Sequence, residues 1–157
     1  MEWKRIDSLN RNRVNAFIEQ HWFTTTMLIR GKEIDMTKVD GFYFSEGKTI
    51  IGLITYLVYD NRLEITSLDS LRENQGIGSR LVEIVLREAK ERNLQKVVLV
   101  TTNDNMNALR FYQKRGFDMV RLFRNSINAA RKLKPEIPLI GENSIPLRHE
   151  IELERFV

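Results

Sequence analysis

The first regular pattern of apolar and polar positions has a helical period and covers Arg11–Trp22. Residues three and four apart share one face of a helix, so this spacing predicts an amphipathic helix. Its apolar stripe consists of Val14, Phe17, Ile18 and Trp22. A weak strand is predicted before it, over Trp3–Ile6, whereas Phe23–Lys38 follows neither period and is expected to be irregular.

Three segments rich in β-branched and aromatic residues follow: Gly41–Ser45, Thr49–Tyr59 and Leu63–Leu68. They are joined by the short polar turns Glu46-Gly47 and Asp60-Asn61, whose residue types favour tight reversals of the chain. Short turns between such segments are typical of antiparallel hairpins. The pattern therefore predicts an antiparallel meander.

After the meander the pattern alternates between helix and strand. A helical stripe runs from Gly76 to about Asn93, the apolar run Lys96–Thr101 is typical of a buried parallel strand, and a second helix, Asn105–Arg115, precedes the strand Phe117–Arg124. This order predicts an α/β fold with a mixed sheet.

The last part of the chain is less regular. Ser126–Lys134 is consistent with a short helix, Pro135–Pro146 with an extended loop, and Arg148–Phe156 with a final strand. Long loops often carry function, so this loop is expected either to overhang a ligand site or to contact a second copy of the chain in a homodimer; the sequence does not choose. With 157 residues and no visible linker, residues 1–157 are expected to form one domain.

Composition removes several classes of protein. The chain has no cysteine and only two histidines, which excludes disulfides and a cysteine nucleophile and argues against a metal site. It contains no apolar run of about 18 residues and no secretory signal at its start, so no membrane span and a cytoplasmic setting are expected. The net charge of +4 suits a phosphorylated small molecule better than a nucleic acid, because basic and acidic residues are interspersed.

The most informative local pattern is a glycine turn at the start of the first helix after the meander. The chain runs from the strand Leu63–Leu68 through Asp69 into Gln75–Arg80, which contains Gly76 and Gly78. Glycines permit a tight turn, and the N–H groups at a helix start favour an anion such as a phosphate. Neither a dinucleotide fingerprint nor a Walker A loop matches, so the turn indicates either an anion cradle or a purely structural reversal.

A second motif strengthens the first. The sequence Gln-Gly-Ile-Gly-Ser-Arg-Leu at 75–81, followed by Asn-x-x-Ala-x-x-Phe-Tyr-x-x-x-Gly-Phe at 105–117, resembles the two acyl-CoA-binding motifs of the GCN5-related N-acetyltransferase (GNAT) family. The resemblance covers about Leu63–Val120. It implies a GNAT-like, mostly antiparallel sheet of six to seven strands flanked by helices, with a central parallel pair after the acetyl-CoA-binding turn.

The resemblance also implies a co-substrate and its site. Acetyl-CoA is expected to bind without a metal, with Asn105 at the pantetheine end of coenzyme A. The residues that the resemblance assigns to it are Leu68, Asp69, Gln75, Gly76, Ile77, Gly78, Ser79, Arg80, Asn105, Ala108 and Tyr112. Asn105 is also well placed to cap its helix.

One position departs from the family pattern. The first motif normally begins with Gln or Arg three residues before its first glycine, where this chain has Glu73. A carboxylate beside a pyrophosphate repels it, although the backbone cradle is unaffected. Arg72 and Arg80 are the candidates to compensate.

Acetyl transfer to an amine requires an acid for the departing thiolate and a base for the amine. The family resemblance assigns the acid role to Tyr112, for which a half-buried packing role is the alternative. Glu64 is the predicted base, because strand alternation is expected to place it on the same side as Thr66 and Leu68, leading to the cradle. The alternative is a solvated Glu64 or one paired with Arg62.

Three further residues are weaker candidates. Asp69 is the second candidate for the base, with a role in forming the turn as its alternative. His21 and Trp22 end the first helix, a region that borders the acceptor pocket in the family. For them the alternative is a packed Trp22 beside an exposed His21.

The preferred hypothesis is therefore an acetyl-CoA-dependent N-acetyltransferase that acts on a small-molecule or peptide amine by direct attack. A non-catalytic acyl-CoA-binding sensor or regulatory module is the alternative. A nucleic-acid-binding domain, suggested only by the net charge, is not expected.

Overall fold

The computed structural model describes residues 2–157, within which no helix has both the length and the apolar character needed to cross a membrane. The chain divides into two compact units. The first comprises the residues up to Met27, Ile34–Val97 and Val157, and the second comprises Leu28–Glu33 and Val98–Phe156. The predicted fold class is confirmed: the chain is α/β, with helices flanking a mixed main sheet of seven mostly antiparallel strands.

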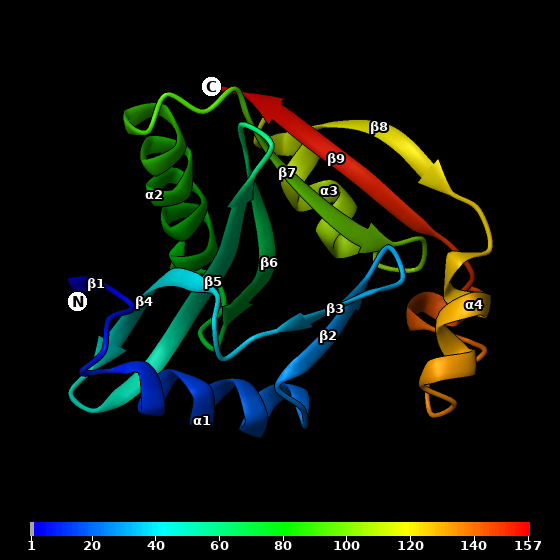
Figure 1. Ribbon diagram of the computed structural model, residues 1–157, viewed down its shortest axis with the longest axis horizontal. Coiled ribbons are helices and arrows are strands. Elements are labelled where there is room, and N and C mark those ends of the chain that lie inside the picture. The colour runs from blue at the N-terminus through cyan, green and yellow to red at the C-terminus, as the bar shows by residue number, and fades with distance from the viewer. Residues whose placement is uncertain (1) are drawn as a thin grey trace. The chain divides into compact units, whose positions relative to one another are not determined.

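The first unit contains an antiparallel meander. Its strands follow the order β1-β4-β5-β6, and every neighbouring pair is antiparallel (Figure 1). The elements are β1 (Glu2–Arg5), α1 (Arg11–Trp22), β4 (Asp40–Glu46), β5 (Thr49–Tyr59), β6 (Arg62–Ser70) and α2 (Ile77–Glu91).

Both predicted turns of the meander are present. Gly47 between β4 and β5 has a φ of +56°, and Asp60 and Asn61 between β5 and β6 have φ of +48° and +60°. These left-handed conformations suit glycine, asparagine and aspartate, and they let adjacent strands reverse over two residues. The predicted bounds of α1 and β5 agree with the structure.

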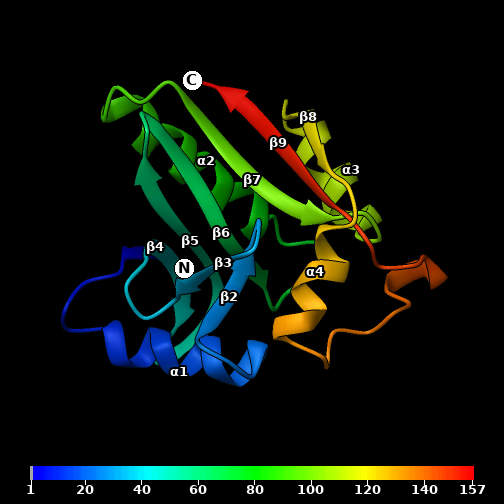
Figure 2. The ribbon, with the colours of Figure 1, turned by 45° about the vertical axis from the view of Figure 1, so that its right-hand side comes forward.

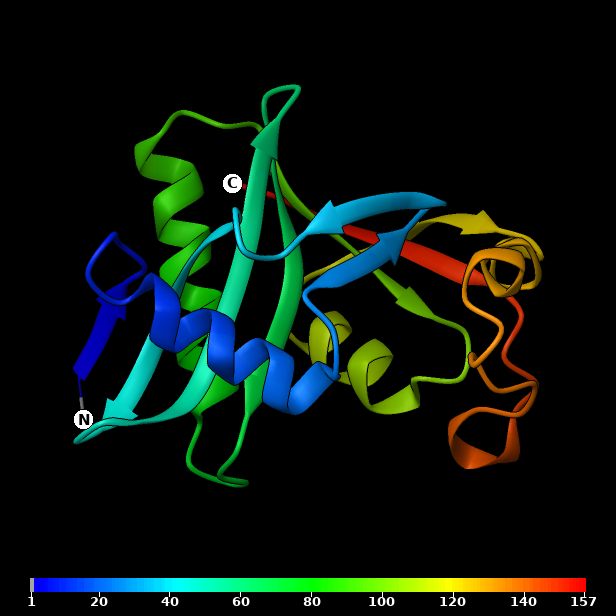
Figure 3. The same ribbon diagram turned by 60° about the horizontal axis from the view of Figure 1, so that its bottom comes forward.

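Strand register gives this sheet two distinct faces. Tyr43, Leu53 and Leu57 share one face, where α1 contributes Val14 and Ile18 to the same hydrophobic cluster. We call this the α1 face. Phe42, Phe44, Ile54 and Tyr56 are buried on the other face, the α2 face, where Gly52 lies against Ile77 of α2. Figure 3 shows α1 crossing in front of β4, β5 and β6.

The second unit has the strand order β7-β9-β8, with β9 between its two neighbours (Figure 2). Strands β8 and β9 are antiparallel. Its core includes Val98, Leu99, Leu109, Phe117 and Leu153. The elements are β7 (Lys96–Thr102), α3 (Met106–Lys114), β8 (Asp118–Phe123), α4 (Ser126–Leu133), a 3-10 turn (Glu142–Ser144) and β9 (Glu150–Phe156).

The expectation that Phe23–Lys38 is irregular was wrong. This segment contains β2 (Thr26–Ile29) and β3 (Lys32–Asp35), which pair as a separate two-stranded sheet. Between them Arg30 and Gly31 both have positive φ, +51° and +74°. An arginine in a left-handed turn is uncommon, so residue type alone does not signal this hairpin.

Candidate active site

The glycine turn forms an uncapped start of α2. Gly76 is exposed and left-handed, with φ +70° and ψ +15°, and no side chain caps the helix there. The first hydrogen bond of α2 joins the Arg80 N–H to the Gly76 carbonyl at 3.0 Å, so the N–H groups of Ile77 and Gly78 precede that turn. Because such groups and the helix dipole attract negative charge, this turn fits a phosphate group.

A second glycine, not predicted from sequence, positions this turn. A Cβ added to Gly52 of β5 would overlap Cγ2 of Ile77 and lie 3.3 Å from Cδ1 of Leu81. Both side chains are fully buried. The first turn of α2 therefore packs directly on the backbone of β5, which keeps its N–H groups in one place.

The two arginines expected to compensate for Glu73 differ. Arg72 forms an ion pair with Glu46. The guanidinium of Arg80 lies 4.7 Å from the centroid of the Phe44 ring, in the first turn of α2. Arg80 thus brings a positive charge to the glycine turn, while the charge of Arg72 is already neutralised.

A β-bulge in β6 changes which side chains share a face. Ile65 lies opposite Tyr56 and Ser67 lies opposite Thr55, so Thr66 is an extra residue between them. An extra residue reverses the alternation beyond it. The expectation that Glu64, Thr66 and Leu68 face one side was wrong, because Leu68 pairs with Ile54 on the α2 face.

The same bulge brings two carboxylates to one face. Glu64 pairs with Leu57 and Asp69 pairs with Leu53, so both lie on the α1 face. The bulge is stabilised by hydroxyls: Oγ1 of Thr55 lies 2.7 Å from Oγ1 of Thr66 and 2.5 Å from Oγ of Ser67. Sequence reasoning did not find this hydroxyl cluster, since the residues meet across two strands.

Glu64 is buried and engaged by a neighbour. Only 3% of the residue is exposed, and its carboxylate accepts a hydrogen bond from the Tyr59 hydroxyl. Arg62 instead lies over the Tyr59 ring, 5.7 Å from its centroid. The alternative of a solvated Glu64 was therefore wrong. Tyr59 was missed, although the Asp60-Asn61 turn brings the two strands together at this point.

Asp69 lies within β6 rather than in the following turn, so its predicted alternative as a turn former was wrong. Its Oδ2 accepts a hydrogen bond from Nε1 of Trp22 at 3.1 Å. Burial raises the pKa of Asp69 above its usual value, although the Trp22 hydrogen bond and the charge of His21 act in the opposite direction. A raised pKa brings a carboxylate closer to the range useful for a base at neutral pH.

The end of α1 differs from the packing alternative. Trp22 is 42% exposed, whereas His21 is half-buried with its ring 4.2 Å from the centroid of the Phe17 ring. His21 lines a cavity of about 330 Å³ beside α1, and Trp22 contacts Asp69. Both predicted substrate residues therefore lie close to a carboxylate or a cavity.

In the second unit, Asn105 caps α3. Its Oδ1 accepts the Ala108 N–H at 3.0 Å, so the capping role predicted as an alternative is present. Tyr112 lies seven residues later and is buried, with ring centroids 5.0 Å from Phe111 and 5.4 Å from Phe117. These contacts give the Tyr112 side chain a defined orientation, as a proton donor requires. Ala108, whose N–H the Asn105 side chain binds, is itself half-buried.

Comparison with known proteins finds a matching family and a similar sequence. The family model described as Acetyltransferase (GNAT) family matches residues 8–117. A relative from Bacillus subtilis (strain 168), named "Uncharacterized protein YxbD", is 44% identical over 144 residues, which is 91% of each chain.

Two solved structures share the fold. The IAA acetyltransferase from Bacillus cereus ATCC 14579 has a TM-score of 0.71 at 20% identity and covers 99% of both chains. A GNAT family acetyltransferase from Elizabethkingia anophelis with acetyl-CoA bound has a TM-score of 0.69 at 22% identity, covering 99% of this chain and 97% of that one. Together with the family match, these likenesses show that the chain belongs to the GNAT acetyltransferase family.

Proposed function

We propose that this chain is an acetyl-CoA-dependent N-acetyltransferase that moves the acetyl group directly to a primary amine. The observation that carries the proposal is the uncapped start of α2, the next element after a strand bearing two carboxylates on one face. The first feature suits a pyrophosphate and the second suits an amine that must lose a proton. A relative with acetyl-CoA bound supports the choice of co-substrate.

Each step has a residue of this chain to perform it. When bound, acetyl-CoA supplies the thioester. The N–H groups of Gly76–Ser79 and the side chain of Arg80 hold the pyrophosphate, Asn105 contacts the pantetheine, and backbone N–H groups near Leu68 donate to the acetyl oxygen.

A carboxylate of β6 takes the proton from the ammonium group. The amine nitrogen then bonds to the acetyl carbon while the carbon–sulfur bond breaks and the Tyr112 hydroxyl gives its proton to the sulfur. The proton that the nitrogen loses as the amide forms passes to solvent, and the Tyr112 oxygen regains a proton from solvent. Of the two carboxylates, Glu64 is the sequence-based choice. Asp69 is favoured by its greater exposure and its raised pKa.

Binding of acetyl-CoA is the first test. Ligand at 100 times its Kd stabilises the folded state by about 2.7 kcal/mol, which corresponds to a rise in Tm of about 5 to 10 °C for a chain of this size. No rise at saturating acetyl-CoA contradicts the proposal. Binding without release of CoA on any amine indicates the non-catalytic module instead.

Tyr112→Phe tests the acid. The variant keeps the ring contacts with Phe111 and Phe117 and removes only the hydroxyl. We expect turnover to fall by about 10²-fold or more, with acetyl-CoA affinity unchanged, measured by thiol release and calorimetry. An equal loss of both indicates a structural role for Tyr112.

A further inference from the structure

The cavity beside α1 has an uneven composition. Its volume is about 330 Å³, near the lower end of the range for small-molecule sites. Its apolar walls come from α1, β5 and the loop after β6, and its polar side chains are mostly basic. The lining residues are Arg13, Ala16, Phe17, Gln20, His21, Lys48, Thr49, Ile50 and Leu71.

Two of the basic residues at this cavity, Arg13 and Lys48, have no acidic partner among the described residues. None of its lining residues is acidic. Within residues 2–157, no carboxylate lies at ion-pair distance from Arg13 or Lys48, and the Nη2 of Arg13 donates to the neutral Tyr43 hydroxyl at 2.7 Å. Glu46, two residues before Lys48, is already paired with Arg72. This side of the cavity is therefore electropositive and suits an anion.

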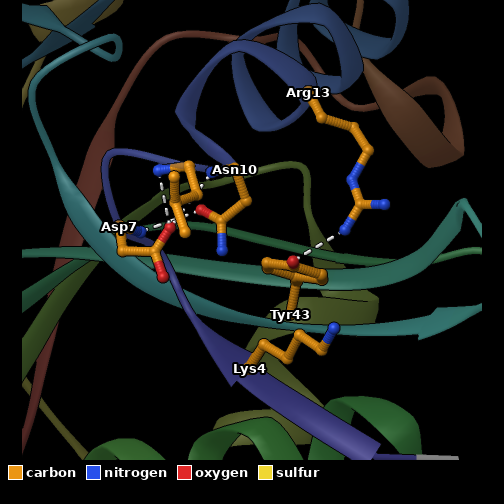
Figure 4. Close-up of a pocket in the computed structure, with 6 residues that line it drawn as sticks. Lys4, Asp7, Asn10, Arg13 and Tyr43 are labelled. Carbon is orange, nitrogen blue, oxygen red and sulfur yellow. Dashed lines mark hydrogen bonds between the residues drawn. The ribbon is translucent and has the colours of Figure 1, made fainter.

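A second cavity of similar volume is also lined by Arg13 but differs in charge. It is lined by Lys4, Asp7, Leu9, Asn10, Arg13 and Tyr43. Figure 4 shows the Arg13 guanidinium reaching Tyr43, with Asp7 and Asn10 on the opposite side. The Asp7 carboxylate accepts the backbone N–H groups of Leu9 and Asn10, so this cavity contains its own anion. Only the first cavity combines basic groups with no acid.

The first cavity lies close to Asp69. The charge of its lining residue His21 acts on the Asp69 carboxylate, and its lining residue Leu71 follows Asp69 by two positions. An acceptor that reaches both places can present an amine to the carboxylate and an anionic group to the basic side chains. Resting on the proposed function, we infer that the acceptor is a small amine carrying a carboxylate or a phosphate, and that Lys48 and Arg13 bind this anion.

Matched pairs of amines test the inference. β-Alanine is compared with β-alaninamide, and O-phosphoethanolamine with ethanolamine, by release of CoA thiol from acetyl-CoA. We expect kcat/KM for the anionic member to be on the order of tenfold or more above the neutral member in at least one pair, because charge-assisted hydrogen bonds are stronger than neutral ones. The pair that responds identifies the anion as a carboxylate or a phosphate.

Lys48→Gln tests the assigned residue, and Lys90→Gln is the matched control. Both lysines are exposed, and Lys90 lies on α2. Lys48→Gln is expected to raise KM for the anionic amine about tenfold and to leave its kcat unchanged. The kcat/KM for the neutral amine and the affinity for acetyl-CoA are also expected to stay unchanged. Lys90→Gln is expected to change none of these. Arg13→Gln is a second variant, which is also expected to raise KM for the anionic amine. Its melting temperature is measured as well, because Arg13 contacts Tyr43.

Three results overturn the inference. One is equal kcat/KM within both pairs, which leaves the proposed function standing. Another is weakened acetyl-CoA binding in Lys48→Gln, which assigns the cavity to a phosphate of the co-substrate. A third is an equal rise of KM for the anionic amine in Lys48→Gln and Lys90→Gln, which attributes the rise to the net charge of the protein and not to Lys48. Failure of the wild-type protein to bind acetyl-CoA contradicts the proposed function itself.

Discussion

The two faces of the first unit's sheet offer different kinds of groups to a ligand. On the α2 face, apolar residues and Gly52 position a helix whose first turn has backbone N–H groups with no side-chain cap. On the α1 face, the chemistry belongs to side chains: Glu64, Asp69, and the basic residues beside α1. The α2 face therefore suits the acetyl-CoA of the proposed function, and the α1 face suits its acceptor.

This difference bears on Glu73, which is unusual for the motif. Glu73 replaces the usual Gln or Arg of the motif, yet the start of α2 has the expected geometry, because its donors are main-chain groups. In the proposed function, each role on the α1 face falls to a single side chain. Substitutions there are expected to affect catalysis and specificity, while substitutions on the α2 face are expected to affect folding and co-substrate binding together.

The largest expected effect is on the α1 face. Asp69→Asn keeps an acceptor for the Trp22 indole but removes the base, so turnover is expected to fall by about 10²- to 10⁴-fold with acetyl-CoA affinity unchanged. Glu64→Gln is the matched variant on the same face. If Glu64 is the base, the larger loss occurs in Glu64→Gln instead.

The dependence of kcat/KM on pH gives a second way to decide whether Asp69 is the base. Burial raises the pKa of Asp69, so the ionised form that accepts a proton is lost at a higher pH than for an ordinary aspartate. If Asp69 is the base, the acidic limb of kcat/KM lies above the usual aspartate range and disappears in Asp69→Asn. A limb that persists in Asp69→Asn contradicts this assignment.

The second effect is on the α2 face. Gly52→Ala places a methyl group where Ile77 and Leu81 already fill the space, so α2 must shift. We expect a loss of about 1 to 3 kcal/mol in the free energy of unfolding and weaker acetyl-CoA binding, measured by urea denaturation and calorimetry. Glu83→Ala, on the exposed side of α2, is the control. If acetyl-CoA binding is unchanged in Gly52→Ala, the packing of α2 on Gly52 does not determine binding at the glycine turn.

The α2 face was also the easier one to predict from sequence. Helical spacing indicated α2, and the glycines indicated the turn, because both depend on residues close together in the chain. The α1 face depends on contacts between distant residues. The Thr66 bulge carries a cluster of hydroxyls from two strands, and it puts Leu68 on the α2 face and Asp69 on the α1 face, beside Trp22. Strand alternation alone cannot reveal such a bulge.

Thr55→Val tests that bulge. The variant keeps the shape of the side chain but removes the hydroxyl that Thr66 and Ser67 contact, both of which are buried. We expect a loss of about 1 to 2 kcal/mol in the free energy of unfolding, because buried hydroxyls lose a partner. Thr55→Ser keeps the hydroxyl and is the control. If Thr55→Val is as stable as Thr55→Ser, the hydroxyls do not stabilise the bulge.

The smallest expected effect is at the end of α2 far from the glycine turn. Nη1 and Nη2 of Arg5 in β1 donate to the Glu88 carboxylate at 3.1 and 2.8 Å, and this hydrogen bonding lowers the pKa of Glu88. Because Arg5 is half-exposed, Glu88→Gln is expected to lower the free energy of unfolding by only about 0.2 to 1 kcal/mol. The contribution is present above the ordinary pKa of glutamate and is lost as the pH falls through the lowered value. Acetyl-CoA affinity is expected to stay unchanged, since the glycine turn lies at the other end of the helix. A change in affinity would show that the whole of α2, and not only its first turn on Gly52, determines co-substrate binding.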